Sequence, residues 1–247
     1  FESSRCIWPG CNNFAYHLAW HLALFRLEVQ DYGEVLRLYD TEIRPVETDD
    51  FRDMANAVSI LWRLEQEGVN VGTRWQGLYE IALKRRTDTA YVFASLHYLL
   101  ALLAAGDDAA AAELVAAMAT CGSDDTEQAR LAGGLGVDMA KTLLRLTVCS
   151  RGSRPHHQND QAFTRSAFDR LVRDMHSIGG SHAQRDVFVR SLMSIAAQAG
   201  DHSAVQTVSK ARHTFRLRDR YDGLIETRLH RGTLEAASDL VPQHGVH

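Results

Sequence analysis

The clearest pattern of apolar and polar positions lies in residues 16–45, where two short amphipathic helices are predicted on either side of a turn at residues 30–33. The first helix carries an ordered apolar face made of Leu18, Trp20, Leu22, Leu24, Phe25 and Leu27. The second presents a matching set made of Val35, Leu36, Leu38, Tyr39 and Ile43. A hairpin this short cannot bury both faces alone, so the pattern predicts stacked neighbouring hairpins, as in helical-repeat proteins.

The helical period continues through the next hundred residues. A helix is expected over residues 51–67, with Gly68 ending it, and another over residues 90–105, with Asp88 as its N-cap. Three further helices are expected over residues 72–85, 109–120 and 126–148. The last of these contains Gly133, Gly134 and Gly136, which predict a bend or close helix packing.

A polar segment with one proline, residues 150–160, predicts an exposed loop between a helical-repeat region at residues 1–149 and a second one at residues 161–247. Beyond the loop, helices are predicted over residues 162–178, 181–199, 201–212 and 218–230, with a frayed tail from Ser238. No strand-like alternation interrupts the helical pattern. The predicted fold is therefore all-α, a tetratricopeptide-like α-solenoid of antiparallel helix pairs that continues across the loop.

Composition narrows the class of protein but not its function. The chain has 247 residues, 45% of them hydrophobic and 23% charged, which is typical of a globular protein. The 27 Lys and Arg are outnumbered by 31 Asp and Glu, so no overall basic field attracts nucleic acid, and the basic stretches 84–86 and 212–220 are interpreted as solvated helix faces. The longest apolar run, residues 91–105, is shorter than the ~20 residues of a membrane span, so we interpret it as a core helix.

The four cysteines, Cys6, Cys11, Cys121 and Cys149, are scattered along the chain, which argues against a disulfide-based secreted fold. A cytoplasmic location is expected on this basis. The chain starts at Phe1, with neither an initiator Met nor a signal-peptide pattern, so we expect further sequence upstream.

Five segments in matching order carry a family resemblance: YHLAWHLALFRLE, YDTEIRP, LWRLEQEGVNVGTRW, FASLHYLLALLAAGD and GGSHAQRDVF. Together they resemble the tetratricopeptide repeat protein 38-like family over residues 16–199. The resemblance is to the later half of such proteins and implies an all-α repeat fold in a chain of about twice this length. It implies no defined biochemical activity. The resemblance weakens at residues 6–13, around Gly134 and after Gly200.

The polar and aromatic positions that match the family pattern are the candidate site residues. They are His17, Trp20, His21, Tyr39, Asp40, Trp62, Gly72, Trp75, His97, Gln184, Arg185 and Asp186. Among them, the ligand-binding candidates are Trp20, Tyr39, Asp40, Trp62, Trp75 and Gln184, and the catalytic candidates are His17, His21, His97, Arg185 and Asp186.

His17 and His21 lie four residues apart, so on a helix both imidazoles project from one face and can ligate one metal ion. Adding Cys6 and Cys11 extends the pattern, but the central spacing is shorter than that of a zinc finger, so no metal or cofactor is predicted. The structural interpretation is that these histidines are hydrogen-bonded within a helix interface. A third interpretation places them with His97 on a concave surface as ligand-binding or acid–base groups. No activated nucleophile accompanies them.

The segment from Gly179 to Asp186 has a structural and a functional interpretation. Ser181 and Gln184 have the spacing of a capping box at a helix start. The free amides of that helix start, with Arg185 nearby, can instead hold a carboxylate or phosphate while Asp186 orients Arg185 or a histidine.

The leading hypothesis is a helical-repeat binding or scaffold protein that recognises a peptide, protein or small ligand on a concave surface near Trp20, Trp62, Trp75 and His97. It predicts a long open groove with buried histidines. The alternative is a hydrolase-like enzyme that gathers His17, His21, His97 and Arg185 around one pocket. The alanine-rich helix at residues 109–120 is a candidate homodimer contact.

Overall fold

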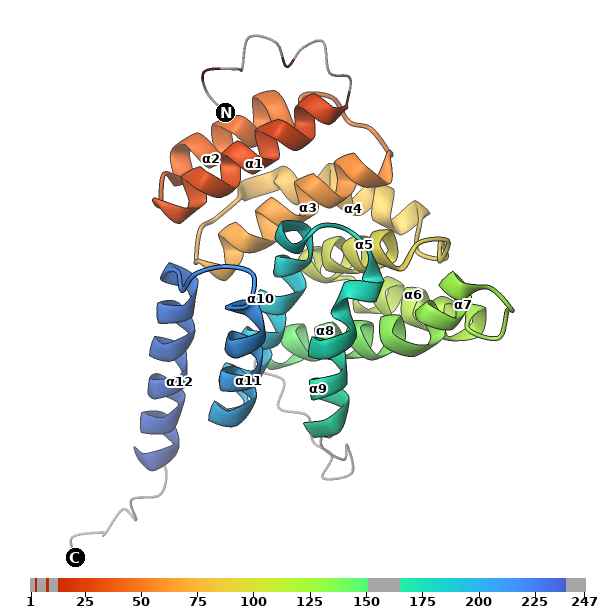
Figure 1. The fold of residues 1–247 in the computed structure, drawn as a ribbon. Coiled ribbons are helices and arrows are strands. Elements are labelled where there is room, and N and C mark those ends of the chain that lie inside the picture. The colour runs from red at the N-terminus through yellow and green to blue at the C-terminus, as the bar shows by residue number, and fades with distance from the viewer. Residues whose placement is uncertain (1–2, 4–7, 9–12, 151–164, 239–247) are drawn as a thin grey trace, which may run out of the picture.

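The computed structural model describes Ser3, Trp8, residues 13–150 and residues 165–238 (Figure 1). All regular elements in these residues are helical. The elements of the first part are α1 (Phe14–Glu28), α2 (Tyr32–Leu38) with the π-helical turn η2 (Tyr39–Ile43), α3 (Phe51–Gln66), η3 (Gly72–Arg74) with α4 (Trp75–Lys84), α5 (Val92–Ala105) and α6 (Asp108–Cys121). Those of the second are α7 (Glu127–Leu131), η4 (Ala132–Gly136), α8 (Val137–Ser150), α9 (Arg165–Asp174), η5 (Met175–Ile178), α10 (His182–Gln198), α11 (His202–Arg212) and α12 (Arg220–Ser238).

The first helices stack as antiparallel pairs, and Figure 1 shows them descending from α1 and α2 through α3 and α4 to α5 and α6. Three side-chain hydrogen bonds join α1 and its cap to α3: Asn13 to Asp53, His17 to Asn56 and Trp20 to Ser59. Both residue numbers increase together along this series, so α1 and α3 run parallel. The first helices of successive pairs are therefore neighbours, and they share an interface with regularly spaced polar contacts.

Helix α10 packs against α3 and α5, so the surface near Trp62 and His97 that was predicted to be open is covered. The Trp62 indole N–H donates to Ser191 Oγ at 2.9 Å, and Arg63 Nη2 donates to the Ala183 carbonyl oxygen at 2.7 Å. The rings of His97 and Phe188 lie 5.0 Å apart. Helix α5 is apolar all round and its residues 92–103 are all buried, so it requires cover on every side. The chain supplies that cover with α3, α4, α6 and α8, and with Phe188 of α10 beside His97.

Local signals in the sequence set most helix ends. Gly68 follows α3 with φ of 84°, in the left-handed region that favours glycine, as predicted. Ser181 and Gln184 form both hydrogen bonds of the predicted capping box. The prediction for α5 was wrong: Tyr91 is its N-cap, and Asp88 lies before the helix and accepts from the Ala90 amide and, through its carbonyl, from the Ser95 hydroxyl.

The helix predicted over residues 126–148 is divided into α7, η4 and α8. The π-helical turn η4 contains Gly133, whose Cα lies against Gly122 at the end of α6: a Cβ added at Gly133 would lie 2.5 Å from the Gly122 Cα. Gly133 therefore serves close backbone packing, whereas a Cβ at Gly134 would have no atom within 4 Å. Helix α8 reaches Ser150, so the predicted loop begins no earlier than residue 151, and residues 151–164 and the tail after Ser238 lie outside the described residues. None of the described helices has the length and apolarity that a membrane span requires.

Candidate functional site

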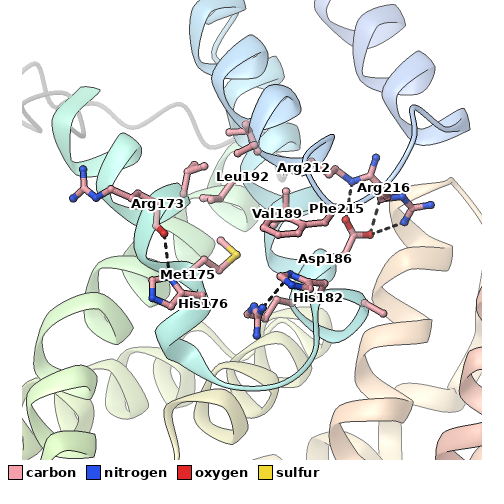
Figure 2. Close-up of a pocket in the computed structure, with 15 residues that line it drawn as sticks. Arg173, Met175, His176, His182, Asp186, Val189, Leu192, Arg212, Phe215 and Arg216 are labelled. Atoms are coloured by element: carbon pink, nitrogen blue, oxygen red, sulfur yellow. Dashed lines mark hydrogen bonds and ion pairs between the residues drawn. The ribbon is translucent and has the colours of Figure 1, made fainter.

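An apolar cavity of about 460 Å³ lies between the α9–η5 segment, α10 and α11 (Figure 2). Its apolar lining consists of Val172, Met175, Val189, Leu192, Val208, Ala211 and Phe215. Ala183, in the first turn of α10, completes the apolar lining, and the polar lining consists of Arg173, His176, His182, Arg185, Asp186, Arg212 and Arg216. Two of the predicted catalytic candidates, Arg185 and Asp186, thus line one cavity.

The turn before α10 positions this cavity. Gly179 and Gly180 have φ of 97° and 72°, conformations that side chains other than glycine rarely adopt. A Cβ added at Gly180 would lie 2.6 Å from Phe93 Cε2 on α5, so this glycine is required by contact as well as by conformation. The capping box at Ser181 then starts α10 immediately. The first turn of α10 is therefore held tightly against α5, and it places His182 and Arg185 at the cavity.

Arg185 is held by backbone carbonyls rather than by a carboxylate. Its Nη1 donates to the carbonyl oxygen of Gly179 at 3.1 Å and to that of Gly180, and its Nη2 donates to His182 Nδ1 at 3.1 Å. No carboxylate among the described residues forms an ion pair with it. Burial lowers the pKa of the Arg185 guanidinium below its usual value, but an arginine remains charged at neutral pH.

His182 is fixed by two contacts. Its ring stacks on Phe215 with centroids 3.9 Å apart and planes 19° apart, and Figure 2 shows the two rings side by side at the cavity. Because Nδ1 accepts a hydrogen bond from Arg185, a neutral His182 carries its proton on Nε2.

Asp186 belongs to a buried ionic cluster made of Asp186, Arg212, Arg216, Asp219 and Asp222. Arg212 is only 3% exposed and pairs with the three carboxylates at 2.7, 2.7 and 3.0 Å. Arg216 pairs with Asp186 at 3.2 Å and with Asp219 at 2.7 Å. Burial by itself raises the pKa of Asp186, but the positive charge of Arg212, Arg63 and Arg216 outweighs it and lowers that pKa below its usual range.

The cluster changes two sequence-based interpretations. Asp186 is an ionised wall of the cavity that pairs with Arg212 and Arg216, and it does not orient Arg185 or a histidine. The stretch 212–220 is solvated only in part, because Arg212 is buried whereas the side chain of Arg218 is 62% exposed. The sequence did contain a signal for a buried ionic cluster. Asp219 and Asp222 follow Arg212 and Arg216 closely, in the loop before α12 and in its first turn, and can neutralise them.

The histidine pair of α1 lies elsewhere. His17 Nδ1 donates to Asn56 Oδ1 at 3.1 Å, and the His17 and His21 rings meet edge to face at 4.6 Å. Burial and then the neighbouring His17 lower the pKa of His21. Across the residues that the structure describes, no three His, Cys, Asp or Glu side chains are grouped as metal ligands. Cys6 and Cys11 are outside those residues, and Cys121 is a free thiol.

A second, polar cavity of about 230 Å³ lies beside this pair, where α1, α3 and the start of α10 meet. It is lined by Asn13, Phe14, His17, Arg52, Asp53, Asn56 and Gln184. It therefore brings together His17 and Gln184, two predicted site residues from distant parts of the sequence. Arg185 and Asp186 line the apolar cavity on the neighbouring side of the same helical turn, so these four candidates are divided between two cavities.

The remaining candidates contribute to packing. Trp20, Trp62 and Trp75 are 0%, 8% and 7% exposed, and their indoles lie within helix interfaces instead of on an open groove. His97 is buried, which lowers its pKa to about 4, and its Nδ1 donates to the Phe93 carbonyl oxygen at 2.7 Å.

Tyr39 is also buried, and its hydroxyl donates to the Arg74 carbonyl oxygen at 3.4 Å. Asp40 forms an exposed bidentate ion pair with Arg74, at 2.8 and 2.7 Å. These two residues join η2 to η3 and are separate from the apolar cavity.

No protein-family model matches the chain, and no solved structure matches it at a significant level. The geometry of the cavities is therefore the basis for a functional proposal.

Proposed function

We propose that this protein is a binding module whose ligand places an apolar group in the apolar cavity between η5, α10 and α11. The observation that carries the proposal is the cavity itself: about 460 Å³ lined mainly by aliphatic and aromatic side chains, with a few charged groups at defined positions. This combination of size and lining is typical of ligand sites. Rigid placement of the α10 start by Gly180 and the capping box supports a preformed site.

The proposed function is ligand binding, as expected from the sequence, but the site is the apolar cavity instead of a concave surface near Trp20, Trp62, Trp75 and His97. Parallel stacking of α1 and α3 supports a tetratricopeptide-like arrangement of the first helix pairs, in line with the resemblance to the tetratricopeptide repeat protein 38-like family. In an open solenoid the ligand lies along the inner helices, but α10 occupies that position here. A peptide, protein or small ligand therefore has its place at the outer side of α10.

We favour binding over the hydrolase-like alternative for two reasons. His17 and Arg185 line different cavities, so these candidates do not share one site. Asp186 is held by Arg212 and Arg216 with a lowered pKa, which makes it a poor base near neutral pH.

The test uses a neutral fluorescent probe of apolar sites, N-phenyl-1-naphthylamine, which emits strongly when it leaves water. We expect saturable binding to the protein and its loss in Ala211→Trp, because the indole fills the cavity from α11. Ser203→Trp adds the same side chain at an exposed position of α11 outside the cavity lining and should bind as the parent does. Equal binding by both variants would show that the probe site is not this cavity.

A further inference from the structure

We infer that the ligand of the apolar cavity is an amphipathic anion, a single carboxylate joined to a medium-length apolar chain, and that Arg185 and His182 bind the carboxylate. This inference deepens the proposed function and rests on it. It concerns the chemical class of the ligand, which the volume and apolar lining of the cavity do not by themselves determine.

The charges of the cavity lining support an anion. Arg212 and Arg216 are paired with carboxylates of the ionic cluster. Arg173 pairs with its neighbour Asp174 at 3.0 Å, and Figure 2 shows its guanidinium turned away from the cavity. Arg185 is the lining arginine without a carboxylate partner among the described residues. A partly buried cation in this situation is stabilised by an incoming anion.

Arg185 also has free donors in a fixed position. An arginine carries five N–H groups, and the hydrogen bonds of Arg185 with Gly179, Gly180 and His182 use three of them. One N–H on Nη2 and the Nε–H have no acceptor in the described part of the chain. Because the carbonyls hold the guanidinium plane, little side-chain entropy is lost when these donors bind a ligand.

His182 supplies a further donor beside them. Its neutral form carries the proton on Nε2, since Nδ1 accepts from Arg185, and stacking on Phe215 fixes the ring. The combination amounts to one unpaired positive charge and one imidazole N–H. That favours a singly charged carboxylate over a phosphate dianion, for which clustered arginines are usual.

The apolar lining determines the other part of the ligand. Met175, Val189, Leu192 and Val208 come from three different elements and face one volume, with Phe215 beside His182 (Figure 2). A ligand with a carboxylate at Arg185 and an aliphatic chain among these residues satisfies both the charge and the apolar surface. A short hydrophilic carboxylate leaves the apolar surface unfilled.

The experiment compares three ligands with the same chain, octanoate, octylammonium and 1-octanol, by isothermal titration calorimetry at pH 7.5. We expect octanoate to bind at least about tenfold more tightly than octanol, which corresponds to one charge-assisted hydrogen-bond pair, and octylammonium to bind most weakly. Octanoate binding should also weaken as salt is raised, whereas octanol binding should not.

Variants assign the effect to Arg185. Arg185→Gln should reduce octanoate affinity about tenfold or more while leaving octanol affinity within twofold, and Arg185→Lys should retain part of the preference because it keeps the charge. Arg173→Gln is the matched control, since it removes a lining arginine that is already paired, and it should leave the preference unchanged. Retained octanol binding shows that the cavity of Arg185→Gln is still folded.

The outcomes separate the two proposals. Octanol bound as tightly as octanoate, or an equal loss of both ligands in Arg185→Gln, overturns the assignment of the carboxylate to Arg185 but leaves the proposed binding function standing. Failure of all three ligands to bind the parent protein, together with failure of the neutral fluorescent probe, overturns both.

Discussion

Between α1 and α3 the buried polar contacts are mainly neutral, whereas around α10, α11 and α12 they are ionic. Trp20 donates to Ser59 and His17 donates to Asn56 in the first region. Arg212 binds three carboxylates in the second, and Arg190 binds Glu67 with side chains only 2% and 4% exposed. Neutral pairs cost little to bury, while a buried charge needs opposite charges or several hydrogen-bond partners to offset its lost hydration. The second region therefore depends on exact pairing and on pH.

The histidines predicted to carry acid–base chemistry and the anion site that we propose lie in different regions of the molecule. The histidines that suggested acid–base chemistry lie in or beside neutral interfaces, where they pack and donate to carbonyl or amide oxygens. Arg185, which has no carboxylate partner among the described residues, lies at the edge of the ionic region. We propose that an anion binds here because Arg185, unlike Arg212 and Arg216, has no carboxylate partner among the described residues.

The largest effect is expected from Arg212→Met, which removes the centre of the ionic cluster. Asp186, Asp219 and Asp222 would then be buried without their main partner, so we expect a loss of about 3–5 kcal/mol in the free energy of unfolding at pH 7. Urea denaturation measures it. Arg218→Met removes an arginine whose side chain is 62% exposed, and that control should change stability by less than about 0.5 kcal/mol.

The pH dependence of that loss identifies its origin. Arg212 lowers the pKa of Asp186 and Asp219 in the folded state, so their contribution is present above the unfolded pKa of about 3.9 and is lost as pH falls through the lower folded value. The difference between parent and Arg212→Met should therefore be complete at pH 7 and shrink below about pH 4. A difference that stays constant down to pH 2 would point to lost packing instead of lost charge pairing.

A smaller effect is expected at His97, which lies between the two regions, on α5 against Phe188 of α10. Burial lowers its pKa from 6.5 to about 4. As pH falls below 6.5, His97 is therefore protonated in the unfolded chain but stays neutral in the folded one. Between pH 6.5 and 4 this group should cost about 3 kcal/mol of stability. His97→Asn keeps a donor for the Phe93 carbonyl oxygen but does not titrate.

We therefore expect His97→Asn to be less stable than the parent at pH 7, because ring packing is lost, yet to lose less stability on acidification to pH 4. Guanidinium denaturation at four pH values between 7 and 4 provides the comparison. Parallel stability curves for the two proteins would contradict the assignment of a buried, neutral His97.

The smallest of these effects is expected from Ser59→Ala in the neutral region. It leaves the buried Trp20 indole N–H without an acceptor, at a cost of about 1–2 kcal/mol that does not vary between pH 5 and 8. Ser191→Ala removes the acceptor of Trp62 at the α3–α10 interface, together with that of Gln66 Nε2 at 3.2 Å, and is the variant for comparison. Similar losses of stability in the two variants would show that α10 is held against α3 by the same kind of contact that joins α1 to α3. A much larger loss for Ser191→Ala would mean that α10 depends on this contact far more than α1 does.

Sequence alone determined the helices and many of their ends, because these depend on contacts within a few residues. The apolar period predicts α1, α3 and α11 to within a few residues, and the capping box at Ser181 and the stop at Gly68 follow from local hydrogen bonding and backbone conformation. The candidate site was predicted only in part: Arg185 and Asp186 do line one cavity, but Phe215 and Arg216 were not singled out.

Only the tertiary structure decided which face each helix buries and which charges meet. An apolar face indicates that a helix is covered but not which segment covers it, so the packing of α10 against α3 could not be derived from the pattern. Arg212 and Asp186 are 26 residues apart in sequence and pair at 2.7 Å in space. Because burial and charge pairing are properties of contacts between distant segments, they distinguish Arg185, which we propose binds a ligand, from Arg212, which holds the fold together.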